Sequence, residues 1–189
     1  MNIMNIKNII GLVVLLSVAG LALASSPAVR AGDDIQPPEL PPLCDSLQVP
    51  PGNRLFFQAY ALGVQVYKWN GSSWDFVAPV ANLYADTNYR LEVGFHYAGP
   101  TWESDTGSKV RAARVPDTGC SPEPTTAIPW LLLQSVETDG PGIFRRVTYI
   151  QRVNTVGGLA PTTPGSSIGA EARIPYTAEY YFYRARRND

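Results

Sequence analysis

The chain has 189 residues, a formal net charge of −1 at pH 7, one histidine and two cysteines. This near-neutral balance excludes the basic field that nucleic-acid binding requires, and the length is sufficient for one domain with a hydrophobic core. One histidine and two widely separated cysteines match no zinc spacing, and no glycine-rich phosphate loop is present, so we expect no metal, nucleotide or other cofactor.

The N-terminus has the features of a secretory signal peptide over residues 1–31. An uncharged apolar run at 9–24 follows Lys7 and is shorter than the roughly 20 residues that cross a bilayer. Small residues allow cleavage after residue 24 or after residue 31. A retained membrane anchor is the alternative. We expect a secreted protein, extracellular or periplasmic, that meets the membrane only through this segment.

A proline-rich lead-in at 32–53 comes next, and proline favours extended chain over a helix or a central strand. From residue 54 to 184 short segments rich in aromatic and β-branched residues alternate with turn clusters, and a basic tail occupies 185–189. Asn70-Gly71 predicts a hairpin because both residue types accept a positive φ. The other predicted strands are 55–60, 63–69, 89–97, 108–115, 130–136, 145–153 and 176–184. This pattern predicts an all-β, single-domain antiparallel sandwich or barrel of about eight or nine short strands.

Two Asp-Thr-Gly triplets, at 105–107 and 117–119, resemble the catalytic motif of aspartic proteases. They lie in consecutive turns with one predicted strand between them, which would place the carboxylates about 25 Å apart. A protease dyad requires about 3 Å, so we interpret both triplets as turns. Ser167 matches a serine-hydrolase elbow, but it lies in the glycine-rich loop 154–173 without the required strand and helix.

Four residues with chemical potential fall within ten positions: His96, Trp102, Glu103 and Asp105, at the end of one strand and in the turn region after it. A histidine beside an acid can perform general acid–base chemistry, and an exposed tryptophan beside acids can stack on a sugar ring. The alternative is that Trp102 packs in the core and that Glu103 holds the turn. We expect a ligand site, if the protein has one, at His96, Trp102 and Glu103.

The strand at 176–184 has two chemically different faces. Tyr176, Ala178, Tyr180 and Phe182 share one face, and Thr177, Glu179, Tyr181 and Tyr183 share the other. One face must be core, and the other is open to a contact or a covering segment. Glu179 is the only partner that we nominate for Glu103 in a two-carboxylate glycosidase.

The two cysteines allow one intramolecular disulfide, Cys44–Cys120, and the alternative is two free thiols. In an oxidising compartment we expect the disulfide.

Six blocks resemble a known family when they are taken in order: GVQVY (63–67), HYAGPTWE (96–103), GSKV (107–110), IPWLLL (128–133), VTYIQRVNTVGGLAP (147–161) and IPYTAEYYFY (174–183). Together they resemble the secreted domain of unknown function 3455 family over about residues 50–184. The resemblance implies export and a single domain. It brings no established activity, because none is assigned to the family.

Three functions follow as hypotheses. The first is a non-catalytic binding or structural protein of the cell surface, with polysaccharide or other surface components as partners. The second is an extracellular polysaccharide-active hydrolase or lyase that uses His96 with Glu103 or Asp105. The third is a surface component that assembles as a homo-oligomer.

Overall fold

The structure is a computed structural model, and residues 35–186 are described. The predicted signal segment, its two cleavage sites and the last three residues of the basic tail lie outside these residues. The described part is almost entirely β. Its elements are η1 (Pro42–Leu47), β1 (Asn53–Trp69), β2 (Trp74–Tyr84), β3 (Glu92–Tyr97), β4 (Thr101–Ser104), β5 (Lys109–Arg114), β6 (Leu131–Asp139), β7 (Val147–Gly157) and β8 (Glu171–Ala185).

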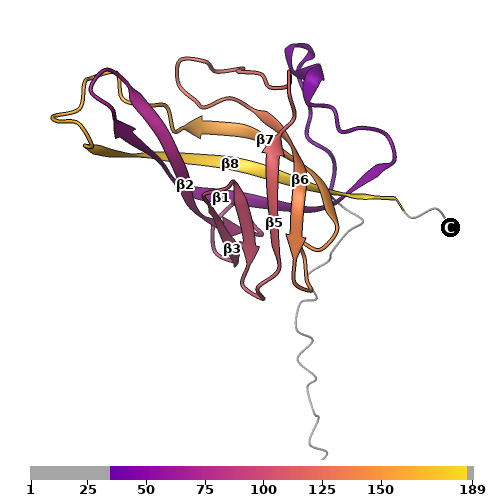
Figure 1. Cartoon of the computed structure of the whole chain (residues 1–189). Coiled ribbons are helices and arrows are strands. Elements are labelled where there is room, and N and C mark those ends of the chain that lie inside the picture. Colours follow the sequence, from indigo (N-terminus) through magenta and orange to yellow (C-terminus); the bar gives the residue numbers. More distant parts are fainter. Residues whose placement is uncertain (1–34, 187–189) are drawn as a thin grey trace, which may run out of the picture.

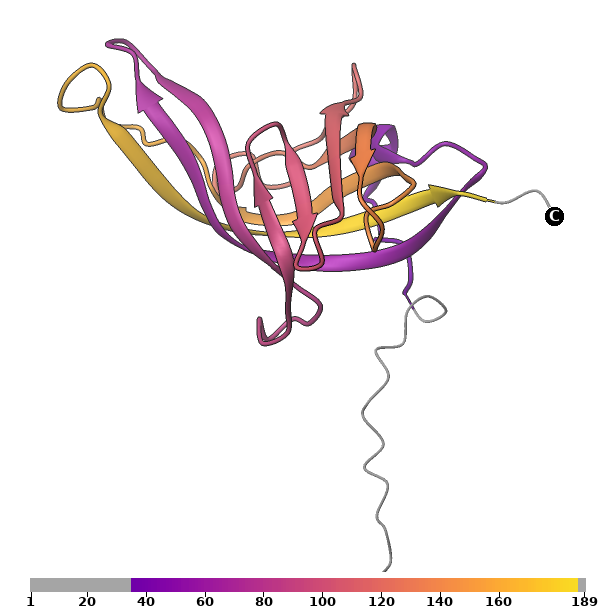
Figure 2. The ribbon, with the colours of Figure 1, turned by 60° about the horizontal axis from the view of Figure 1, so that its bottom comes forward.

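The eight strands form a closed barrel in which each strand pairs antiparallel with the next and β8 pairs with β1 (Figure 1). Closure pairs the strands all around the ring, and unpaired edges remain only where strands run past it, as in residues 74–80 of β2. The end of β1, the start of β2 and the start of β8 continue past the ring as a curved arm (Figure 2). The predicted all-β, single-domain fold is therefore confirmed as a barrel.

Some local predictions differ from the structure. The loop predicted at 154–173 is shorter, because β7 continues to Gly157 and β8 begins at Glu171. The strands predicted at 55–60 and 63–69 are one strand, β1, in which Gly63 brings β1 so close to β2 that a Cβ would overlap the backbone of Val80 and Ala81. Residues 101–104, interpreted as part of a turn region, form the short strand β4.

The predicted hairpin at Asn70 joins β1 to β2 through four residues, 70–73. Of its two central candidates only Gly71 has a positive φ, of 106°. Asn70 instead acts through its side chain, whose Oδ1 accepts hydrogen bonds from the backbone N–H groups of Ser72 and Ser73, both at 2.9 Å. Asparagine therefore stabilises this turn as an Asx turn.

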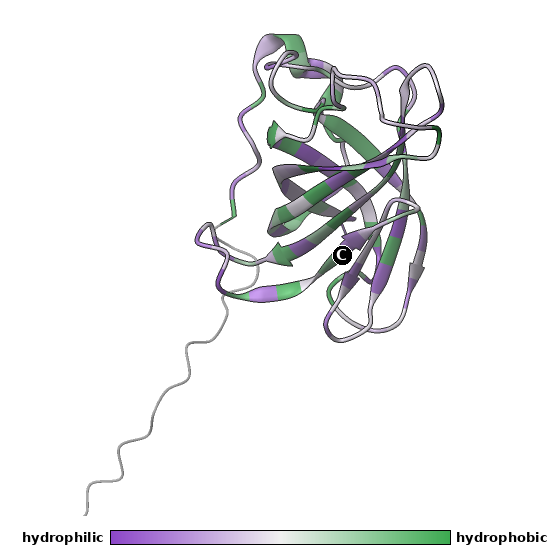
Figure 3. Ribbon diagram, turned by 90° about the vertical axis from the view of Figure 1, so that its left-hand side faces the viewer, coloured by the Kyte–Doolittle hydropathy of each residue, from purple (hydrophilic) through white to green (hydrophobic). Residues whose placement is uncertain are grey.

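The core fills the inside of the barrel because inward and outward residues alternate along the strands, as the hydropathy colours show (Figure 3). On β8 the predicted division holds: Tyr176, Ala178, Tyr180 and Phe182 belong to the interior cluster. On the opposite face, Tyr181 and Tyr183 are also buried, because Leu40 and Val49 of the N-terminal segment contribute to the cluster that covers them.

The two ends of the barrel differ. The β6–β7 connection closes one end, which we call the closed end, with the fully buried Phe144. Its ring centroid lies 5.0 Å from that of Phe182 and 6.3 Å from that of Phe57, and its backbone N–H donates to Ser108 Oγ at 3.1 Å. The other end, which we call the open end, is bordered by the start of β2, the β3–β4 turn and the start of β6.

The N-terminal segment is attached to the outside of the barrel. Cys44 and Cys120 form the predicted disulfide, with their Cα atoms 5.3 Å apart. Gln151 Nε2 donates to Leu47 O at 2.7 Å, and Tyr183 Oη donates to Gln151 Oε1 at 2.6 Å. Residues 42–47 form a 3-10 helix, so the proline-rich lead-in is extended only in part. Among residues 35–186, no helix is both long and apolar enough to span a membrane.

Candidate functional site

A cavity of about 320 Å³ lies inside the barrel at its open end. Its walls come from seven strands, β2 to β8, and from the β3–β4 turn, so residues far apart in the sequence meet there. The lining residues are Phe76, Val77, Pro79, His96, Ala98, Gly99, Pro100, Trp102, Arg114, Leu131, Leu133, Arg152 and Tyr180. None of them is acidic. Two of the three residues predicted for a ligand site, His96 and Trp102, are among them.

His96 and Trp102 are cross-strand partners on β3 and β4, and their rings stack with centroids 4.3 Å apart. His96 Nδ1 lies 2.8 Å from Thr101 O; a carbonyl oxygen only accepts, so Nδ1 carries the proton and Nε2 is left as an acceptor. Burial lowers the pKa of His96 from 6.5 to about 3. The imidazole is therefore neutral at physiological pH.

Trp102 is only 1% exposed, so its ring cannot stack on a polysaccharide at the outer surface. Its indole ring packs edge to face with Tyr180, at a centroid distance of 5.3 Å. Trp102 Nε1 and the hydroxyls of Tyr180 and Tyr176 are buried and have no hydrogen-bond partner. Unpartnered buried donors cost free energy, and a ligand oxygen in the cavity would satisfy those that line it.

Two arginines supply positive charge to the same cavity. Arg152 pairs with Tyr180 on one side and with Leu131 on the other, which places it on the inward face of β7. Its Nη2 and Nε donate to Pro129 O at 2.8 and 3.2 Å. Arg114 lies at the rim, where its guanidinium donates to Thr118 O. The charge of Arg152 is near enough to contribute to the lowered pKa of His96, after burial.

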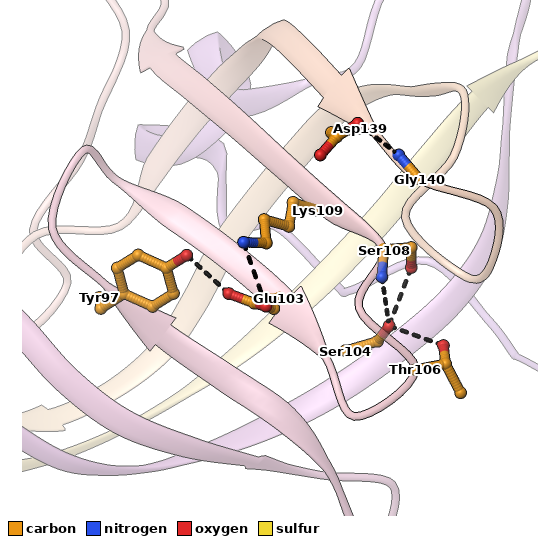
Figure 4. Close-up of polar contacts among 8 residues, drawn as sticks. All are labelled: Tyr97, Glu103, Ser104, Thr106, Ser108, Lys109, Asp139 and Gly140. Carbon is orange, nitrogen blue, oxygen red and sulfur yellow. Dashed lines mark hydrogen bonds and ion pairs between the residues drawn. The ribbon is translucent and has the colours of Figure 1, made fainter.

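Glu103, the third predicted site residue, lies on the outer face of β4. Its Oε2 accepts a hydrogen bond from Tyr97 Oη at 2.7 Å, and its Oε1 lies 3.2 Å from Lys109 Nζ (Figure 4). The Tyr97 hydrogen bond, followed by Lys109, lowers the pKa of Glu103. Asp105 is exposed in the turn after β4. Neither acid lines the cavity, so the structure does not pair His96 with either of them.

Glu179 lies on the outward face of β8, where its Oε2 accepts hydrogen bonds from Gln58 Nε2 at 2.9 Å and Tyr181 Oη at 2.8 Å. In the closed strand order, β4 and β8 occupy opposite walls of the barrel. Glu103 and Glu179 therefore point away from each other, and they do not face one another across a cleft as the two carboxylates of a glycosidase must.

The protease-like triplets are turns, as interpreted from the sequence. Asp105 and Asp117 lie at opposite ends of β5, and Gly107, Asp117 and Gly119 have positive φ values. Ser167 lies in the β7–β8 connection, which contains no helix. Within residues 35–186, no group of three or more His, Cys, Asp or Glu side chains is arranged to hold a metal ion.

Sequence reasoning missed the two arginines of the cavity. The sequence contained a signal for Arg152. It lies two residues after Ile150 and so shares its inward face, but it is charged where the other inward residues are apolar. A charged residue at an inward position of a strand indicates a solvated or ligand-filled interior. Arg114 gave a similar signal, because it follows the inward-facing Val110 and Ala112 in the alternation of β5 and breaks their apolar pattern.

Comparison with protein families gives one finding: the model of the family described as "Protein of unknown function (DUF3455)" matches residues 50–184. These residues include all of β1 to β7 and all of β8 except Ala185. Searches of curated proteins and of solved structures find no match to this chain.

Proposed function

Because the chain belongs to the DUF3455 family, whose description names no activity, we propose its function from the geometry of the barrel. The protein is a secreted, non-catalytic binding protein that holds one small amphipathic anion in the cavity at the open end. The Cys44–Cys120 disulfide is consistent with an extracellular location, and secretion itself is part of this proposal.

The observation that carries the proposal is the composition of the cavity wall. Apolar side chains such as Leu131 and Leu133 lie beside two guanidinium groups, and no carboxylate is present. Pockets with mostly apolar walls and few convergent polar groups are typical of small-molecule sites, and about 320 Å³ is at the small end of their range. One aromatic ring system or a short chain with a carboxylate fits this description, with the anionic group on Arg152 and Arg114.

Binding is favoured over hydrolysis by the placement of the titratable groups. His96 has no acidic neighbour in the cavity and stays neutral because it is buried. Glu103 and Glu179 lie on opposite outer walls, where each is held by hydrogen bonds. Among the candidates His96, Glu103, Asp105 and Glu179, the polysaccharide hydrolase or lyase hypothesis therefore has no pair positioned for acid–base chemistry on one substrate.

The test compares 2-naphthoate with its neutral methyl ester, two ligands with the same ring system. We expect quenching of tryptophan fluorescence by both and roughly tenfold tighter binding of the anion, since a charge-assisted hydrogen bond contributes about 1.5–3 kcal/mol. Arg152→Gln removes the preference for the anion. Ala98→Trp fills the mouth of the cavity and weakens binding of both ligands.

Glu103→Gln is the control, because it changes a carboxylate outside the cavity, and it should leave both affinities unchanged. Equal affinity of the wild type for acid and ester would contradict the anionic part of the proposal. Release of sugar ends from a polysaccharide by the wild type, lost in Glu103→Gln, would replace the binding function with the hydrolase.

A further inference from the structure

Four arginines from three strands gather at the closed end of the barrel, away from the cavity. Arg54 lies on β1, Arg146 precedes β7, and Arg184 and Arg186 lie at the end of β8 and just after it. With Val147, Thr148 and Ala185 they line a surface cleft of about 590 Å³, which we call the arginine cleft. The sequence shows only the run at 184–187; the strand pairings add Arg54 and Arg146.

Among residues 35–186, no acid forms an ion pair with the arginine cleft. Arg54 and Arg184 are direct cross-strand partners, and like charges in that position destabilise a sheet. The ion pairs found between residues 35 and 186 lie elsewhere, at Lys109–Glu103, Arg111–Glu137 and Arg173–Glu171. Burial, followed by the charges of Arg54 and Arg146, lowers the pKa of Arg184. A bound polyanion would relieve this repulsion.

Parts of the arginine cleft are fixed before any ligand arrives. Arg184 Nη2 donates to Ile143 O at 2.7 Å, and its guanidinium carbon lies 3.6 Å from the centroid of the Phe56 ring. Arg146 has a φ of 66°, in the left-handed region that non-glycine residues adopt rarely. Residue 146 is the last residue of the turn that leads into β7, so this φ is the conformation of a turn residue.

We propose that the arginine cleft binds an acidic polysaccharide, whose carboxylate or sulfate groups contact Arg54, Arg146 and Arg186. Four guanidinium groups exceed what a single monovalent anion neutralises, so the ligand carries repeated charges. Of the described residues, those that line the cleft include no aromatic side chain on which nucleic-acid bases could stack. This site is separate from the proposed cavity function and lies at the other end of the barrel.

The experiment measures binding of the purified protein to dextran sulfate and polygalacturonate, with uncharged dextran as the blank. The triple variant R54Q/R146Q/R186Q spares Arg184, which packs on Phe56. We expect at least about tenfold weaker binding of either polymer, and a salt dependence reduced by about two to three in slope, because each lost contact releases one counterion fewer.

The matched control is K68Q/R90Q/R173Q, which removes the same formal charge from exposed positions outside the cleft. It should bind within about twofold of wild type, since only distant charge is lost. Equal losses in both triple variants, no loss in the first, or tighter binding of single-stranded DNA than of either polysaccharide would overturn the proposal. Naphthoate binding in R54Q/R146Q/R186Q should match wild type, which separates failure of this site from failure of the cavity.

Discussion

His96 shows how burial changes the chemistry of a residue that looks catalytic in the sequence. It lies inside the barrel with 2% of its surface exposed, and its pKa falls to about 3. Between that value and 6.5, the unfolded chain binds a proton that the folded protein does not. The contribution of neutral His96 to the free energy of unfolding is therefore fully present above about pH 6.5. Below that pH it decreases by about 1.4 kcal/mol per pH unit.

Urea unfolding at pH 7 and pH 5 measures this effect directly. Since the chain has one histidine, we expect the wild type to lose about 2 kcal/mol of unfolding free energy over this interval, and His96→Phe to lose much less. Glu103 contributes little here, because its ordinary pKa of 4.5 lies below this pH interval and its pKa in the folded protein is lower still. An equal loss in wild type and His96→Phe would show that His96 is not the titrating group.

The contrast between Trp102 and Glu103 shows what could be predicted about the site. Both were selected as neighbours in sequence, but adjacent residues on a strand point to opposite faces. The structure places Trp102 inside and Glu103 outside. The sequence therefore predicted the region of the site but not which of its side chains point into the barrel. Residues 101–104 were interpreted as a turn region, and the alternation of side chains between two faces applies only to strands.

At the scale of elements, the β6–β7 connection acts as the plug of the closed end. Phe144 is fully buried and contacts the interior through Phe57 and Phe182, whereas Phe95 is 42% exposed on the outside of β3. Truncating a buried phenylalanine removes apolar contacts and leaves a cavity. We expect Phe144→Ala to cost about 3–5 kcal/mol in unfolding free energy and Phe95→Ala to cost under about 1 kcal/mol. Comparable losses in the two variants, measured by urea unfolding, would contradict the role of the plug.

Most strands could be predicted because their aromatic and β-branched residues fall between turn clusters, as in β7 and β8. The sequence does not show that 55–60 and 63–69 are one strand, because a glycine inside a strand pattern suggests a break. In the structure Gly63 is needed because the backbone of β2 lies too close for a side chain. The pattern of strands in the sequence also does not distinguish a sandwich from a barrel. The pairing of β1 with β8, which decides between them, joins residues far apart in the chain.

At the scale of the whole molecule, closure of the barrel creates both proposed sites. Pairing of β8 with β7 brings Arg152 opposite Tyr180 at the open end, and pairing of β8 with β1 brings Arg184 opposite Arg54 at the closed end. The buried Phe144 and the aromatic core separate the two ends. A ligand at one end is therefore not in contact with residues of the other.

The disulfide attaches the N-terminal segment to the barrel across a sequence separation of 76 residues. Closing a loop of that length restricts the unfolded chain, and the chain-entropy model gives about 4 kcal/mol for the stabilisation. We expect C44S/C120S to lose about that much unfolding free energy in urea while far-UV circular dichroism keeps its β signature, because the strand pairings do not involve Cys44. Naphthoate affinity should stay within about twofold, since neither cysteine lines the cavity. A reduced wild type should match the double variant. If stability is unchanged in both, hydrogen bonds such as Gln151 to Leu47, rather than the disulfide, hold the segment in place.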